Sequence, residues 1–532
     1  MEYFRVRNGV AARDGSQAMK TRLTSEDSDV KVDGNSKYHD LLDNTAHADG
    51  LKQRSVRGGL FSMGGSGINF ALRLGATYIL ARILLKEHFG LIGMVTAITA
   101  IAETFKDFGL SVATIQKKTI THQQVSALFW INALVGLTMT ALVCCLSVFI
   151  GWFYKDSRLI WITLALSTTF LWSGLAVQHQ AILWRKMRFA PLAVVDTLAT
   201  LFSIVLAVVL ALKGFGVWAL VSQQVSRSFF FAIGTWLACP WRPGPPGRTE
   251  GIGKMMKMGG DLTAFNLITF FADNLDFMLI GKTIGADALG TYRQGSQLAL
   301  LPVSFIQGSV HAVAPPALRV LLTDVPRYRA YYKKILSSMT FVNMPGMLFL
   351  FIYAREIVMF LLGDKWTGAI VIFQIFALAG FIRPAISTAG FIMISCGLTR
   401  RYLFIGVLNS LFIIAGIVIG MHWGMIGIAL GTVIANYIFF LPVAYLAFRN
   451  TPVSVGLFVT AIIPSFLCSV TMGLVAKGFS SLNLIHNSNA ALAASFVVAS
   501  TSYLLVWALI PGGKAKLREL YTDFSSVFRS RA

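Results

Sequence analysis

Residues Gly65 to Lys118 read GSGINFALRLGATYILARILLKEHFGLIGMVTAITAIAETFKDFGLSVATIQKK, and this stretch decides the fold. Two apolar arms, Gly67–Leu85 and Leu91–Ile115, are each about as long as a helix that crosses the hydrocarbon core of a bilayer. The arms nevertheless carry five ionisable residues: Arg73, Arg82, Glu103, Lys106 and Asp107. A charge at the centre of a membrane helix costs about 2.5–3.5 kcal/mol, so it normally faces protein or a water-filled cavity. We therefore expect this hairpin to form one wall of a polar cavity inside a membrane.

The composition extends this interpretation to the whole chain. Of its 532 residues, 55% are hydrophobic and 13% are charged, whereas a soluble domain is about 45–50% apolar and about 25% charged. Apolar runs near twenty residues recur after residue 58. The pattern predicts an all-α, polytopic membrane protein with about 14 transmembrane helices, arranged as two pseudo-symmetric six-helix lobes plus two C-terminal helices.

The net charge of +22 is explained by membrane topology. The basic residues lie mostly in short loops between apolar runs, and cytoplasmic loops carry an excess of Lys and Arg. With the N-terminus placed inside, about 22 basic residues fall in cytoplasmic loops and the C-terminal tail, and about seven fall in the opposite loops. We therefore expect both termini in the cytoplasm, and we exclude nucleic acid as a partner.

A repeat divides the chain into these lobes. At an offset of 200 residues, Ala81–Gly90 aligns with Gly281–Gly290, so that Arg82 meets Lys282 and Gly90 meets Gly290. The two segments are the turns of hairpins that lie six helices apart, which predicts a parallel repeat. The expected organisation is as follows: 1–57, disordered cytoplasmic tail; 58–239, N-lobe; 240–257, proline-rich cytoplasmic linker; 258–450, C-lobe; 451–511, helices 13 and 14; 512–532, cytoplasmic tail.

The charges inside the predicted helices are the candidate functional residues. An arginine binds phosphate oxygens with two parallel hydrogen bonds and keeps its charge when buried. We predict that an anionic substrate is bound by Arg73, Arg227, Arg293, Arg383 and Lys106. Charge balance or ion coupling is expected from Glu103, Asp107, Asp273 and Asp276. Pairing between these acids and bases, which would only lock helices together, stays an open alternative.

No motif of an enzyme occurs in the chain. A phosphate-binding loop, a zinc-protease HExxH and a nucleophile elbow are all missing from the sequence, and the cysteines lack metal-ligand spacing. We therefore expect neither catalysis nor a metal nor another cofactor. Coupling to H⁺ or Na⁺ is left open.

Three blocks of the sequence resemble the Wzx-type polysaccharide flippases. They are Leu80–Gly93 continuing to Phe105–Ser111, Gln178–Phe189, and Asn274–Gly281 leading to Leu289–Tyr292. The resemblance spans about residues 58 to 510 and places the chain in the multidrug, oligosaccharidyl-lipid and polysaccharide exporter superfamily. It implies two six-helix lobes plus two helices, alternating access, and an undecaprenyl-pyrophosphate-linked oligosaccharide as cargo.

The resemblance predicts a flippase in a bacterial inner membrane that serves exopolysaccharide, capsule or O-antigen (lipopolysaccharide) assembly. Its expected partners are the lipid-linked oligosaccharide, membrane lipids and a polysaccharide polymerase or co-polymerase. A cation-coupled drug extruder and a lipid II flippase on the same fold are the alternatives. A membrane-embedded glycosyltransferase is disfavoured because the longest loops, about twenty residues, are well short of a domain.

Overall fold

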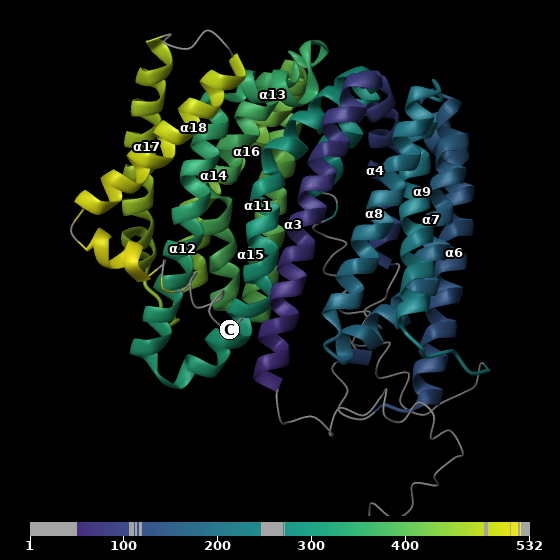
Figure 1. Cartoon of the computed structure of the whole chain (residues 1–532), viewed down its shortest axis with the longest axis horizontal. Coiled ribbons are helices and arrows are strands. Elements are labelled where there is room, and N and C mark those ends of the chain that lie inside the picture. The colour runs from purple at the N-terminus through teal and green to yellow at the C-terminus, as the bar shows by residue number, and fades with distance from the viewer. Residues whose placement is uncertain are drawn as a thin grey trace, which may run out of the picture.

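The structure, a computed structural model, describes residues 51–105, 111, 114–115, 120–245, 270, 272–482, 488–510, 512–519 and 522. Across these ranges the chain forms helices joined by short turns, without a strand. Long helices stand side by side in two groups, with α3 between them in the view of Figure 1. The chain is therefore an all-α, multi-pass membrane protein.

The first group, the N-lobe, packs through adjacent antiparallel helices. Helix pairs α6–α7 and α8–α9 make its largest contacts, and α3 packs on α8. Gly65 of α3 permits this approach, because a side chain there would lie 2.8 Å from the Ala193 Cβ. The helices of the N-lobe are α3 (Leu51–Ile83), α4 (Lys86–Phe105), α6 (His122–Tyr154), α7 (Arg158–Arg185), α8 (Phe189–Leu212) and α9 (Val217–Ala238).

The second group, the C-lobe, is built around α14, which packs closely on α11, α12 and α16. Two further helices, α17 and α18, cover its outer side at one edge of the molecule (Figure 1). The elements are helical residues 272–283, α11 (Ala286–Val320), η3 (Leu321–Thr323), α12 (Val325–Ile352), α13 (Ala354–Leu362), η4 (Asp364–Trp366), α14 (Ala369–Ser395), α15 (Thr399–Gly420), η5 (Met421–Trp423), α16 (Gly424–Phe448), α17 (Val455–Ser481) and α18 (Ser488–Leu509).

One boundary differs from the sequence prediction. Helix α3 begins at Leu51, inside the segment 1–57 predicted as a tail, since Leu, Lys, Gln and Arg are good helix formers. Helix α12 ends at Tyr353, whose hydroxyl donates to the carbonyl of Ala476 at 2.7 Å, and α13 continues from there.

Eight described stretches are long and apolar enough to cross a membrane by length and composition. Helices α3, α4, α9 and α11 are not among them. All four contribute residues to the wall of the cavity described below. The predicted count of about fourteen spans stays a prediction.

The two lobes meet where α4 packs along α11. Gly90 and Gly290, which the repeat pairs in sequence, form the crossing point. A Cβ on Gly90 would lie 2.9 Å from the Ala286 Cα and closer still to its carbonyl, while one on Gly290 would lie 3.0 Å from the backbone nitrogen of Gly90. The two helices therefore touch through their backbones, which glycine alone permits.

Hydrogen bonds surround this crossing in a pattern related by the repeat. Arg82 at the end of α3 donates to the carbonyl of Phe360 in α13 at 2.8 Å. Its repeat partner Lys282 donates in the opposite direction to the carbonyl of Phe153 at the end of α6, and lies over that residue's ring. Each cation thus caps the C-terminal end of a helix in the other lobe, a favourable place for positive charge.

A second set of contacts reinforces the same end of the molecule. Lys365 of η4 donates to the carbonyls of Arg82 (3.0 Å) and Leu84 (2.5 Å), and the Trp366 indole donates to the carbonyl of Ala81 at 2.9 Å. The Trp366 ring also packs edge-on against Phe89, with centroids 5.4 Å apart. We call residues 81–93, 282–293 and 360–366 together the closed end.

Candidate functional site

A central cavity of about 1000 Å³ lies between the lobes, next to the closed end. Its wall comes from α3, α4 and α9 of the N-lobe and from residues 272–283, α11, α14, α15 and α16 of the C-lobe. Along α11 the lining residues run from Arg293 to Gln307, fourteen positions later, which corresponds to about 21 Å of helix. The cavity is therefore long enough to take an extended polar ligand.

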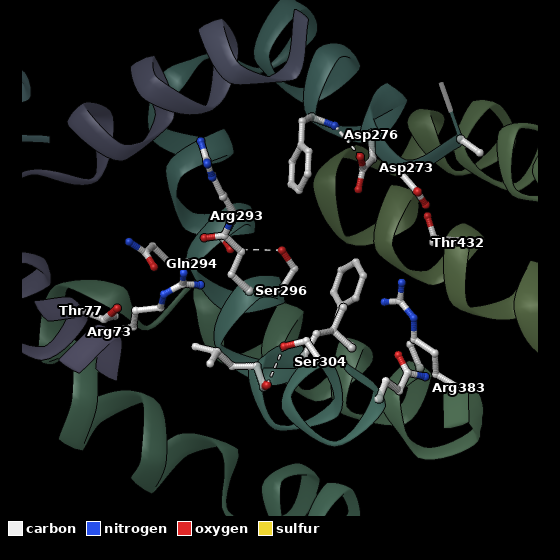
Figure 2. A pocket seen from close by; sticks show the side chains of 18 of the residues that line it. Arg73, Thr77, Asp273, Asp276, Arg293, Gln294, Ser296, Ser304, Arg383 and Thr432 are labelled. Atoms are coloured by element: carbon white, nitrogen blue, oxygen red, sulfur yellow. Dashed lines mark hydrogen bonds between the residues drawn. The ribbon is translucent and has the colours of Figure 1, made fainter. Parts of the chain in front are cut away.

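Three of the predicted arginines line this cavity. Arg73 comes from α3, Arg293 from α11 and Arg383 from α14. Figure 2 shows Arg73 and Arg293 at one side of the hollow and Arg383 at the other. Arg293 is held in place by a hydrogen bond of 2.8 Å to the hydroxyl of Thr96 on α4. The guanidinium groups thus approach the cavity from both lobes.

The two predicted aspartates on residues 272–283 also reach the cavity wall, but they differ in environment. Their spacing of three residues places them on one face of the helix. Asp273 is exposed to the cavity and lies within electrostatic range of Arg383. Asp276 is 7% exposed and accepts hydrogen bonds of 2.8 Å from the Tyr292 hydroxyl and from the backbone N–H of Phe277. Asp273 is the carboxylate that can meet a ligand.

Arg227 lies elsewhere. It lines a second cavity inside the N-lobe, donates to the Asp196 carboxylate at 2.7 Å and contacts the Thr200 hydroxyl at 3.3 Å. The pairing alternative left open by the sequence is thus realised at this residue. Its position midway along a helix predicts its depth in the membrane but not the side of the helix from which it projects.

Of the remaining predicted site residues, the structure describes only Glu103. Glu103 is exposed near the end of the described part of α4 and is not among the residues that line either cavity. Lys106 and Asp107 lie outside the described residues. Their predicted roles stay predictions.

Side-chain amides are the part of the site that sequence reasoning missed. Gln223 and Gln224 of α9 face the cavity from the N-lobe, and further amides face it from the C-lobe: Gln294, Gln297, Gln307, Asn409 and Asn436. A side-chain amide carries two N–H donors and an acceptor oxygen, so it can donate a hydrogen bond to a hydroxyl group or accept one from it. The signal was present in α11, where polar residues recur every three or four positions.

The cavity therefore combines two kinds of recognition chemistry. Among the lining residues that the structure describes, three guanidinium groups against two carboxylates leave a formal excess of one positive charge, which favours an anion. The surrounding amides and the hydroxyls of Ser296, Ser304 and Thr432 suit an uncharged ligand rich in hydroxyl groups. A ligand with an anionic group joined to a hydroxylated one would use both.

Comparison with known proteins identifies similar chains. A family model described as polysaccharide biosynthesis protein matches residues 79–371. The lipopolysaccharide biosynthesis protein WzxC of Escherichia coli (strain K12) is 25% identical over 446 residues, which cover 80% of this chain and 89% of that protein. The teichuronic acid biosynthesis protein TuaB of Bacillus subtilis (strain 168) is 25% identical over 429 residues, 79% of this chain and 88% of its own length.

Among solved structures, the inward closed conformation of the lipid II flippase MurJ is similar in fold. It matches with a TM-score of 0.69 and 16% sequence identity, covering 84% of this chain and 97% of MurJ. At this identity the likeness concerns the arrangement of the helices alone.

Proposed function

Because the chain belongs to the polysaccharide biosynthesis protein family, we propose that it flips a lipid-linked oligosaccharide across the bacterial inner membrane. The cargo is an oligosaccharide repeat unit on undecaprenyl pyrophosphate, destined for exopolysaccharide, capsule or O-antigen assembly. The names of the relatives in lipopolysaccharide and teichuronic acid biosynthesis support a polysaccharide pathway. The central cavity, with guanidinium groups and amides between two lobes, is the observation that carries the proposal.

The chemistry of the cavity suits the two polar parts of this cargo. Arg73, Arg293 and Arg383 supply donors for the pyrophosphate oxygens, and a guanidinium cannot be neutralised by losing its proton at physiological pH. Asp273 balances the charge of Arg383 when the cavity is empty. An arriving pyrophosphate therefore competes with this carboxylate, as well as with water, for the Arg383 guanidinium. The amides bind sugar hydroxyls, and the lipid chain stays in the bilayer.

We place the closed end on the periplasmic side. The excess of Lys and Arg in the loops at the opposite end supports a cytoplasmic location for that end. The cavity then receives its cargo from the cytoplasmic leaflet, and the closed end must open to release it. The backbone crossing at Gly90 and Gly290 would part in that step. A polymerase or co-polymerase in the periplasm is the partner that takes the released unit.

A cation-coupled drug extruder is the second candidate, and the cavity charge disfavours it. An excess of guanidinium groups repels lipophilic cations, which would require a wall dominated by carboxylates. A lipid II flippase shares the anionic carrier chemistry. It is disfavoured because the similar sequences carry names from polysaccharide biosynthesis.

The test replaces the cavity arginines in cells that depend on this gene for surface polymer. Arg73→Ala and Arg383→Ala should each lower export by about 10–150-fold and cause lipid-linked oligosaccharide to accumulate, because a lost charge-assisted hydrogen bond costs about 1.5–3 kcal/mol. Arg400→Ala, at an exposed residue outside the cavity lining, is the matched control and should export normally. Membrane levels of each variant are measured in parallel. Normal export by both cavity variants would refute the proposal.

A further inference from the structure

A second cavity of about 540 Å³ lies inside the N-lobe, between α3, α7, α8 and α9. Its lining includes the Asp196–Arg227 pair, and it is distinct from the central cavity in every described lining residue. A pocket of this volume falls in the range of small-molecule sites. The flipping mechanism above makes no use of it.

The polar groups of this N-lobe cavity are arranged around Asp196. One carboxylate oxygen accepts from Arg227 at 2.7 Å, and the other accepts from the Asn69 side-chain amide at 2.9 Å. The side chains of Arg227 and Asp196 remain 40% and 31% exposed, so the pair faces open space. The two charges cancel, and the arrangement favours a neutral ligand that can both donate and accept hydrogen bonds.

Asn69 adds a group without a partner. The residue is 8% exposed and lines the cavity, and its amide oxygen has no hydrogen-bond partner among the residues that the structure describes. A buried acceptor left without a donor costs about 1–3 kcal/mol. A hydroxyl group of a ligand in the cavity would remove this cost.

The wall also offers aromatic surface. Trp184 is 40% exposed and lines the cavity, as do Phe189 and Phe231. Aromatic rings present a flat apolar face beside the polar cluster. A ligand with apolar C–H faces and polar edges, which is the surface of a sugar ring, matches both parts of the lining.

Helix α3 connects the two cavities. Asn69 lines the N-lobe cavity, and Arg73, one turn further along the same face, lines the central cavity. Arg73 also lies within electrostatic range of Asp196 and Arg227. A ligand whose anionic group sits at Arg73 therefore has the N-lobe cavity within reach of its neutral end.

We propose that the N-lobe cavity is a saccharide subsite that binds neutral sugars of the cargo while the pyrophosphate occupies the central cavity. This proposal rests on the proposed function and extends it, because it gives the oligosaccharide a second site, beyond the sugars that the amides of the central cavity bind next to the pyrophosphate. Asn69, Asp196 and Arg227 bind sugar hydroxyls, and Trp184 packs on a ring face.

The test measures protection of introduced cysteines in the purified full-length chain. Ser66→Cys reports on the N-lobe cavity and Ser304→Cys on the central cavity. Peptide mass spectrometry reads maleimide alkylation at each position, so the native cysteines can stay. Two probes are compared: undecaprenyl pyrophosphate, and the sugar-bearing lipid extracted from cells of the same organism that lack this gene. Ser173→Cys is a second reporter in the N-lobe cavity.

The subsite predicts that only the sugar-bearing lipid protects Ser66→Cys, whereas both lipids protect Ser304→Cys. At a lipid concentration about ten times its Kd, alkylation should slow about tenfold. If both lipids protect Ser304→Cys and neither protects the N-lobe reporters, the subsite is refuted and the proposed function stands. Equal protection of Ser66→Cys by both lipids would also refute it. Protection of neither cavity by either lipid would overturn the proposed function itself.

Discussion

Replacing Gly290 by alanine perturbs the crossing that joins the two lobes. The added Cβ would overlap the carbonyl oxygen of Lys86, and it would lie 2.9 Å from the carbonyl carbon of Lys86 and 3.0 Å from the nitrogen of Gly90. Carbon atoms in contact are normally about 3.5–4.0 Å apart. The atoms in the way belong to the backbone, so no side chain can rotate to relieve the overlap. Helices α4 and α11 must separate by roughly 1 Å, at a cost of about 1–3 kcal/mol for overpacking.

This cost applies to the conformation in which the closed end is shut. Transport requires that end to open, so the substitution should favour the open conformation by about 5–150-fold. The assay is alkylation of Leu84→Cys, a position that is 3% exposed within the closed end. Its rate should rise by that factor in the Gly290→Ala background, because a buried thiol reacts only while its surroundings are open.

Gly75→Ala in α3 is the matched control, since a Cβ there meets no atom within 4 Å. Alanine is a better helix former than glycine, so this variant should be neutral or slightly stabilising. An unchanged alkylation rate in Gly290→Ala, together with normal polymer export, would mean that the crossing does not separate during transport.

Three further predictions concern other parts of the molecule. Lys282→Gln removes a cation from the end of α6 and should weaken the closed end by about 0.3–1 kcal/mol. The rate of Leu84→Cys alkylation should therefore rise less than it does in Gly290→Ala, and an equal or larger rise would contradict this. Gln294→Leu removes an amide from the central cavity and should weaken binding of the sugar-bearing lipid more than binding of undecaprenyl pyrophosphate. Both affinities are measured by titration of the purified chain. Equal weakening would mean that this amide does not contact the sugar. Arg158 lowers the pKa of Asp156 through hydrogen bonds of 2.7–3.1 Å. This carboxylate therefore contributes stability at neutral pH, which is lost as the pH falls through its lowered pKa, below about 3.9. The thermal midpoint of Arg158→Gln should depend less on pH in that range than the midpoint of the unchanged protein, and identical pH profiles would refute the coupling.

The cavity arginines could be predicted because a charge inside a membrane helix must face protein or a water-filled cavity. Arg73, Arg293 and Arg383 each interrupt an apolar run, and the energetic cost of leaving them in lipid indicates a polar surrounding. The sequence could not separate Arg227 from this set. Which cavity a side chain enters depends on the rotation of its helix, and that rotation is set by packing against α8.

The amides escaped prediction for a related reason. A glutamine or asparagine carries no charge, so Gln223 or Asn436 in an apolar run does not stand out as Arg383 does. The repeat, by contrast, predicted more than the division into lobes. Gly90 and Gly290 align in the sequence and meet in the structure, because elements related by a parallel repeat approach each other at the axis between the lobes.

The most direct test of lipid flipping reconstitutes the purified chain in vesicles that contain the sugar-bearing lipid in both leaflets. Periodate, which does not cross the membrane, oxidises sugars in the outer leaflet only. The experiment is run without a gradient and under H⁺ or Na⁺ gradients. A flippase should make the inner-leaflet lipid oxidisable in at least one of these conditions, and the Arg383→Ala variant should not. An oxidised fraction equal to that of protein-free vesicles in every condition would contradict the proposed function.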